Sequence, residues 1–137
     1  YYLEFAQQLL EGKTPEEAYT IVKESVATFS QDKEINPNEI AFFDRLLIGN
    51  IANQEEIEIK SSGYVIHTLE ASIWCLLTSK TYKEATLKAV NLGEDTDTTG
   101  AVTGGLAAIA FGFNSIPKEW LKNISRSKDI DQLIIKK

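Results

Sequence analysis

Apolar residues recur every three or four positions along most of this chain, which is the period of an amphipathic α-helix. The period predicts helices over residues 1–10, 15–29, 37–47, 64–77, 82–92, 100–112, 116–121 and 129–135. Residues 50–62 lack this period, and the alternation of Ile57 and Ile59 with charged neighbours is compatible with one short extended piece. One such piece does not make a sheet, so the pattern predicts a helical protein.

Three of the predicted helices begin with a hydroxyl or amide residue that is followed three positions later by glutamate, the pattern of a capping box. The pairs are Thr14 with Glu17, Asn36 with Glu39, and Thr81 with Glu84. Gly12 and Gly93 are placed to end two of the helices. The connections are short and no linker or internal repeat is present. We therefore expect one compact, all-α, multi-helix domain of about seven or eight helices.

The composition is that of an ordinary globular protein, with 43% hydrophobic and 25% charged residues. A net charge of -6 argues against a nucleic-acid partner, which needs clustered basic residues. No stretch reaches the length of a membrane-spanning helix, so no membrane partner is expected. The single cysteine, Cys75, has apolar neighbours that predict a buried structural thiol in a reducing compartment. We therefore expect a cytoplasmic protein.

The densest group of oxygen donors lies in residues 93–100, with the sequence GEDTDTTG. In a curled approach to a helix, the carboxylates of Asp95 and Asp97 can point at one centre, and the Thr98 hydroxyl completes an oxygen face. Such donors suit magnesium, manganese or calcium, and suit zinc poorly because no paired imidazole or thiolate is present. The next helix has small residues four positions apart, which permit close approach of a neighbouring helix or leave room for a ligand: Gly100, Gly104 and Ala108.

Helix capping is the competing interpretation, because an aspartate before a helix is most often an N-cap. Two aspartates and three threonines exceed what one helix end requires, which favours a metal. A calcium loop that begins at Asp95 places Leu106 at its twelfth position, where a bidentate glutamate is needed, so that motif fails. An Asp-x-Asp-x-Thr phosphatase motif fits Asp95, Asp97 and Thr99 locally. It needs a preceding buried strand, where this pattern predicts a helix, and it stays the weaker alternative.

Two blocks of sequence extend the signal beyond this turn. Residues 93–101 follow the pattern GxDTDTxGA and lead into a glycine- and alanine-rich helix and a later IPxxW segment at 116–120. Residues 62–71 follow the pattern SGYVxxTLxA. In motif, order and spacing these blocks resemble the ADP-ribosylglycohydrolase family, of the dinitrogenase-reductase-activating glycohydrolase type. The resemblance runs over most of residues 1–122.

The resemblance implies an all-α hydrolase that removes ADP-ribose from a modified protein side chain or a small ADP-ribosyl substrate. In such enzymes two divalent cations, Mg²⁺ or Mn²⁺, hold the ribose hydroxyls and a water near the anomeric carbon, where cleavage passes through an oxocarbenium-like state. Three residues match the family's C-terminal metal ligands: Asp95, Asp97 and Thr98. Three others match the segment that lines the ADP-ribose cleft, the last as the expected direct contact: Ser62, Gly63 and Tyr64.

The family's N-terminal Gly-Asp-x-x-Gly segment and its Thr-Asp-Asp-Thr metal motif are absent from this sequence. The chain also begins at Tyr1 inside an apolar-periodic segment and contains no methionine. We therefore expect residues 1–137 to be a fragment, the C-terminal portion of a single domain. The metal site is then incomplete, and the catalytic acid/base lies in the missing N-terminal half of the same domain. Glu94 stands where the family commonly has glycine, and a non-catalytic ADP-ribose- or nucleotide-binding or structural relative is the alternative function.

Four further side chains are assigned structural roles from their positions. His67, the only histidine, falls at a variable position of the second block and is expected to be structural or on the surface. Glu70 lies one helical turn away, on an expected solvated face. Trp74 and Trp120 follow apolar periods and are expected in the core.

Overall fold

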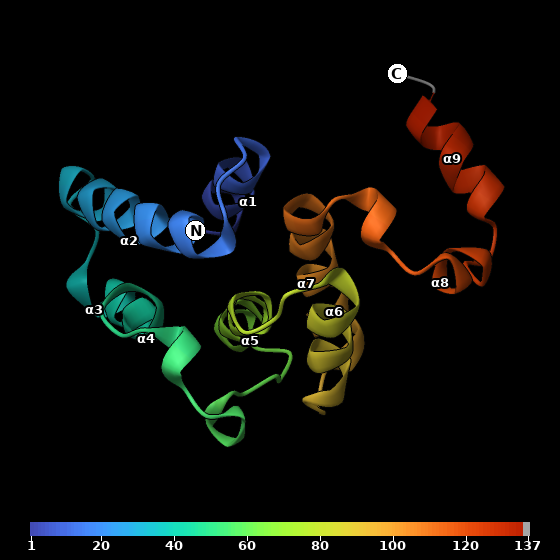
Figure 1. The fold of residues 1–137 in the computed structure, drawn as a ribbon. Helices are drawn as coiled ribbons and strands as arrows, with labels where there is room; N and C mark the ends of the chain where they lie inside the picture. Colours follow the sequence, from blue (N-terminus) through green and yellow to red (C-terminus); the bar gives the residue numbers. More distant parts are fainter. Residues whose placement is uncertain (136–137) are drawn as a thin grey trace.

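The computed structural model describes residues 1–135, and in that range every regular element is helical. The α-helices, labelled as in Figure 1, are α1 (Tyr2–Leu10), α2 (Pro15–Asp32), α3 (Pro37–Ile40), α4 (Asp44–Leu47), α5 (Val65–Leu77), α6 (Tyr82–Asn91), α7 (Thr96–Phe111), α8 (Lys118–Lys122) and α9 (Ser127–Ile135). The all-α prediction is confirmed. Within the described residues, no helix combines the length and the apolar character needed to cross a membrane.

Helix α5 lies at the centre of the molecule, with α6 and α7 on one side and α2 on the other (Figure 1). It is buried on nearly every face, and the run from Leu69 to Leu76 is buried throughout. Cys75 lies in this run, and burial raises the pKa of its thiol to about 12, which confirms the predicted structural thiol. Because other elements pack around α5, the start of this helix at Val65 has a fixed position, and so has the end of the loop before it.

Helices α6 and α7 pack closely because α7 presents glycines to its neighbours. A Cβ atom at Gly100 would lie 2.8 Å from Val90 Cγ1 on α6, which is closer than real Cβ contacts come. On another side of α7, a Cβ atom at Gly105 would lie 3.0 Å from the Tyr2 hydroxyl on α1. The close approach at Gly100 agrees with the prediction from the small residues of this helix, and the approach at Gly105 is a second one that was not predicted.

The predicted caps of α2 and α6 are present. The Thr14 hydroxyl accepts from the Glu17 N–H at 3.2 Å, and the Glu17 carboxylate accepts from the Thr14 N–H at 2.8 Å, which makes a complete capping box. The Thr81 hydroxyl accepts from the Glu84 N–H at 3.1 Å, but the Glu84 carboxylate accepts from the N–H of Lys80 instead of Thr81. At α6 only one of the two hydrogen bonds of a capping box is therefore present, the one that the Thr81 hydroxyl accepts.

The single helix predicted over residues 37–47 is wrong in its continuity. The segment forms α3, a 3₁₀ turn at Ala41–Phe43 and then α4. The Asn36 side chain accepts from the N–H of Asn38 and forms no capping box, because the N–H of Glu39 donates to the Asn36 carbonyl at 2.9 Å. Helix α2 also runs to Asp32, three residues past its predicted end.

The extended piece within residues 50–62 is also wrong. Two 3₁₀ turns occupy this stretch, at Ile51–Asn53 and Glu56–Glu58. Because no strand lies alongside within the described residues, the backbone of these two turns makes hydrogen bonds between residues three positions apart. The burial also departs from the alternation, which would place Ile57 and Ile59 on one face: Ile59 is buried and Ile57 is 90% exposed.

The two tryptophans differ. Trp74 is buried in α5 as predicted, and its Nε1–H donates to the Gln54 carbonyl at 3.0 Å. Trp120 is only partly buried, with its ring centroid 6.1 Å from that of Tyr82. The core prediction for Trp120 is therefore wrong, because α8 lies at the edge of the molecule, away from α5 (Figure 1).

Candidate functional site

The two sequence blocks of the candidate site meet at the N-terminal ends of α5 and α7. Ser61, which is 2% exposed, joins them. Its Oγ donates to the Gly93 carbonyl at 2.8 Å, and its own carbonyl accepts from the Asp95 N–H at 3.1 Å. These two hydrogen bonds hold the loop before α5 against the turn before α7.

Gly63 lies directly against the acidic turn. A Cβ atom built on Gly63 would be 3.0 Å from Asp95 Oδ2, with no other heavy atom closer. Any larger residue would therefore push the carboxylate aside or shift the loop. Glycine at position 63 lets the Asp95 side chain rest on the backbone of the first block.

Asp95 and Asp97 lie in the first turn of α7 as two neighbouring carboxyl groups. Asp95 occupies the N-cap position, yet its side chain makes no capping hydrogen bond, so the capping interpretation does not hold for it. The Asp95 carboxyl group, and then the backbone N–H groups of Asp97 and Thr98, hold the pKa of Asp97 below its usual range. Asp97 is exposed and Asp95 partly so, which leaves both carboxyl groups accessible to a ligand.

The donor set at this turn is made of oxygen atoms at the positive end of a 16-residue helix. Carboxylates and the Thr98 hydroxyl suit Mg²⁺ or Mn²⁺ in chemistry. Among the residues that the structure describes, no third histidine, cysteine, aspartate or glutamate joins Asp95 and Asp97. The residues present therefore fit part of a divalent-cation site. The turn follows helix α6, so the strand that an Asp-x-Asp phosphatase motif requires is not what precedes it.

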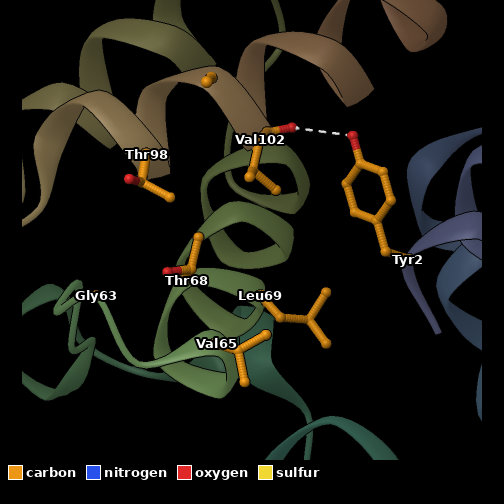
Figure 2. A pocket seen from close by; sticks show the side chains of 8 residues that line it. Tyr2, Gly63, Val65, Thr68, Leu69, Thr98 and Val102 are labelled. Carbon is orange, nitrogen blue, oxygen red and sulfur yellow. Dashed lines mark hydrogen bonds between the residues drawn. The ribbon is translucent and has the colours of Figure 1, made fainter.

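A pocket of about 560 Å³ opens beside this turn, between α1, α5 and α7 (Figure 2). Gly63 and Thr98 lie toward one end of it and Tyr2 lies at the other, where the Tyr2 hydroxyl donates to the Val102 carbonyl at 3.5 Å. The remaining lining residues are mostly apolar: Val65, Thr68, Leu69 and Ala101. The size and the largely apolar lining are those of a small-molecule site.

Tyr64 does not line this pocket. With His67 it borders a separate hollow of about 310 Å³, and the two rings meet edge to face with their centroids 5.1 Å apart. Ser62 Oγ lies 2.7 Å from His67 Nδ1, so the histidine holds the loop, in agreement with its expected structural role. The structure thus brings Gly63 to the acidic turn and places Tyr64, which is 47% exposed, in a different hollow.

Glu70 is not on a solvated face, contrary to the prediction. It is 4% exposed, and its Oε2 lies 3.5 Å from Arg45 Nε. Burial raises the pKa of Glu70, and the neighbouring Arg45 opposes that shift. The prediction assumed that only the apolar side of α5 is buried. It failed because other elements cover α5 on nearly all sides, including the side that carries Glu70.

Three residues near the site were missed from the sequence: Tyr2, Ser61 and Thr68. Thr68 is buried and donates to the carbonyls of Ser62 and Tyr64, at 3.3 and 3.4 Å. Its place within the second block was a signal that could have identified it. Ser61 and Tyr2 had no such signal, because each contacts a segment that is distant in sequence.

Comparison with known proteins places these features in a wider group. Residues 1–136 match the family model described as ADP-ribosylglycohydrolase. The chain is similar to the ADP-ribosylarginine hydrolase Tri1 of Serratia proteamaculans (strain 568), with 37% identity over 107 residues, which is 76% of this chain. It is also similar to the ADP-ribosylarginine hydrolase Tri1 of Pseudomonas putida (strain GB-1), with 36% identity over 85 residues and 62% of this chain.

A third relative is the ADP-ribosyl-[dinitrogen reductase] glycohydrolase of Rhodospirillum rubrum, with 35% identity over 65 residues and 47% of this chain. The matched regions span 29%, 23% and 22% of these three relatives, in the order given. The chain therefore corresponds to less than a third of the length of each.

Proposed function

Because this chain belongs to the ADP-ribosylglycohydrolase family, we propose that residues 1–137 form the C-terminal portion of a hydrolase that removes ADP-ribose from modified proteins. Two relatives are named ADP-ribosylarginine hydrolase, which supports arginine as the modified side chain. The observation that carries the proposal is the Asp95 carboxyl group, which makes no capping hydrogen bond at the start of α7 and lies against Gly63, with the Asp97 carboxyl group beside it.

Asp95, Asp97 and Thr98 are the residues that would hold Mg²⁺ or Mn²⁺, as one side of a two-cation site. A bound cation supplies charge that orients ribose hydroxyls and lowers the pKa of a coordinated water. The positive end of α7 does not repel the carboxylates but stabilises them in the ionised form that a cation requires. The lowered pKa of Asp97 supports this assignment.

The pocket beside the turn is the proposed place for part of the ADP-ribosyl group. Its apolar residues, such as Leu69 and Val102, exclude water and lower the local dielectric, which strengthens interactions with the nearby carboxylates. Thr68 and Thr98 contribute hydroxyls that can orient a sugar. Tyr64 lines the separate hollow next to this pocket's loop, and Ser62 holds His67, which lines the same hollow, so both are proposed to border the substrate from that side.

The remaining cation ligands and the catalytic acid/base are proposed to come from residues outside 1–137. Two observations support this: the carboxyl pair has no third acidic partner in the described residues, and the chain matches under a third of each relative. The partner of this chain is then the rest of the same domain. The free, buried Cys75 supports a cytoplasmic location for the whole.

A non-catalytic ADP-ribose-binding protein is the second candidate. It is favoured by the lining of the pocket, in which the Tyr2 phenol is the one titratable group. A protein that only binds ADP-ribose needs the pocket and the cation but no catalytic acid/base. The two candidates differ in turnover and not in affinity, so an assay of release separates them.

The test is release of ADP-ribose from an ADP-ribosylarginine peptide by the encoded polypeptide that contains residues 1–137, with Mg²⁺ and with a chelator. We expect release that requires the cation and that falls at least about 100-fold in Asp97→Ala. Ser30→Ala, a substitution in α2 remote from the turn, is the control. Unchanged release in Asp97→Ala would sink the catalytic assignment, and ADP-ribose binding without release would favour the binding protein.

A further inference from the structure

We propose that Ser61 is the positioning residue of the divalent-cation site, acting by fixing the turn that carries Asp95. This inference rests on the proposed function, because it takes Asp95 and Asp97 as cation ligands. Ser61 itself contacts the backbone of the turn and not the carboxylates. Its role is therefore exerted through Gly93 and Asp95.

The turn before α7 needs external support because of its backbone. Gly93 and Glu94 both have positive φ angles, 89° and 54°. Few residues other than glycine adopt this left-handed conformation in the described part of the chain, and Glu94 is one of them. A left-handed conformation costs a residue with a Cβ about 1 kcal/mol or more. The two groups that flank Glu94, the Gly93 carbonyl and the Asp95 N–H, are the two that Ser61 binds. Ser61 thus bridges the strained residue from both sides.

The direction of the Asp95 side chain depends on this bridge. The Asp95 carbonyl accepts the first helical hydrogen bond of α7, from Thr99 N–H at 3.1 Å, but its carboxylate makes no cap contact that would orient it. Its position is set by the backbone that Ser61 holds and by the Gly63 backbone that it rests on. When a residue that contacts a metal ligand, but not the metal, is replaced, the affinity for the metal typically falls by roughly 10- to 100-fold.

The neighbouring serine does not share this role. The Ser62 hydroxyl is engaged with His67, five residues away on α5, and makes no hydrogen bond to the acidic turn. Ser61 is the better buried of the two and bonds across 32 residues of sequence. The inference is therefore specific to one of two adjacent hydroxyls.

The first experiment needs no metal. Amide hydrogen exchange at Asp95 is measured in the encoded polypeptide that contains residues 1–137, for wild type, Ser61→Ala, Ser61→Thr and Ser30→Ala. Ser30 is a matched control, since it is also buried and its hydroxyl donates to a carbonyl, that of Val26, at 2.7 Å. Ser61→Ala removes the Oγ hydrogen bond to the Gly93 carbonyl and keeps the Ser61 carbonyl that accepts from the Asp95 N–H. We expect the turn to open more often without the Oγ bond, so that Asp95 exchange is roughly fivefold to tenfold faster in Ser61→Ala only. Equal exchange in Ser61→Ala and Ser30→Ala would overturn the bridge.

The second experiment measures cation binding in the same four proteins, by Mn²⁺ broadening of backbone NMR signals in a titration into the millimolar range. In wild type we expect broadening at residues 94–98 and at Gly63. The Mn²⁺ concentration for half-broadening should rise at least about tenfold in Ser61→Ala, with recovery in Ser61→Thr and no change in Ser30→Ala. A purely structural role would lower stability in both alanine variants without separating their Mn²⁺ affinities.

The outcomes distinguish this inference from the function on which it rests. Wild-type broadening that is unchanged in Ser61→Ala overturns the positioning role and leaves the cation site standing. Absence of wild-type broadening at residues 94–98 of the encoded polypeptide, with Asp95 exchange still dependent on Ser61, removes the cation site from this turn and with it the positioning role. Ser61 then serves the fold alone.

Discussion

Helices α2 and α7 both begin at a polar residue after a turn, but they use that residue differently. At α2, the Thr14 side chain turns back to accept the Glu17 N–H, and Glu17 returns the contact. At α7, Asp95 occupies the same position and makes no capping hydrogen bond. Helix α2 uses its N-cap side chain to satisfy its own backbone, and α7 leaves the carboxyl group at its N-cap position without a capping hydrogen bond.

The difference shows how a helix end becomes a binding site. The N–H groups in the first turn of any helix attract negative charge. At α2 the negative charge that meets these N–H groups is the Glu17 carboxylate of the capping box. The hydrogen bond from the Thr14 N–H lowers the pKa of Glu17. At α7 the pKa of Asp97 is lowered first by the Asp95 carboxyl group and then by the backbone N–H groups of Asp97 and Thr98, so the two carboxyl groups lie next to each other at this helix end. The predictions below exchange features between these two helix ends.

The largest expected effect comes from giving α7 the cap of α2. In Asp95→Thr, we expect cation-dependent ADP-ribose release by the encoded polypeptide to fall at least about 100-fold. The free energy of unfolding should stay unchanged or rise by up to about 1 kcal/mol, because threonine can cap where aspartate does not. Release assays and urea unfolding measure the two effects. A protein that loses stability and activity together would show that Asp95 is structural after all.

The reciprocal exchange at α2 should affect stability alone. Thr14→Ala is expected to lower the free energy of unfolding by about 1 kcal/mol, since the hydroxyl that accepts the Glu17 N–H is lost. Thr14→Asp, which can still cap, should stay close to wild type. Neither change should alter Mn²⁺ broadening at the acidic turn. A change in cation affinity with Thr14→Ala would mean that the two helix ends are coupled.

A smaller effect is expected from the strain that α7 carries and α2 does not. Thr14 has an ordinary extended backbone, whereas Glu94 has a φ of 54°. Glu94→Gly should therefore raise the free energy of unfolding by about 0.5–1 kcal/mol, as glycine adopts this conformation without a Cβ penalty. Thermal unfolding of this variant beside Glu56→Gly, a surface control, measures the gain. A loss of stability would show that the Glu94 side chain makes a contact that outweighs its strain.

The smallest effect is a pH dependence of the α2 cap. The pKa of Glu17 is lowered in the folded state by its contacts with Thr14. A lowered pKa in the folded state gives stability that is present above the unfolded value of about 4.5 and is lost as pH falls through the folded value. The stability difference between wild type and Glu17→Gln should therefore shrink as pH is lowered from 6 toward about 3. A difference that is constant over this range would contradict the capping contact.

The sequence predicted those features that depend on neighbouring residues. The Thr14 box, the close packing of glycines in α7 and the burial of Cys75 all follow from residues within a few positions of one another. The two candidate blocks were also found locally, and the family match agrees with the family resemblance they showed. The physics of caps and helical periods acts over one or two turns, which is why these predictions could be made.

What was missed depends on distant contacts. Glu70 looked solvated because its burial is decided by the elements that surround α5 and by Arg45, 25 residues earlier. Ser61 stood in a stretch without a period, and its partner Gly93 lies 32 residues later. The alternation of Ile57 and Ile59 with charged residues predicted the wrong backbone and one shared face, since a strand needs a partner that the pattern could not supply, and Ile57 is exposed.

The central claim is that the carboxyl groups of Asp95 and Asp97 bind a divalent cation, and that the Asp95 side chain makes no capping hydrogen bond for this reason. The most direct measurement is a manganese anomalous-difference map from crystals of the encoded polypeptide grown with Mn²⁺. We predict a peak about 2.0–2.3 Å from carboxylate oxygens of both Asp95 and Asp97. A map without a peak at this turn, with the Asp95 carboxylate accepting a backbone N–H of α7, would contradict it.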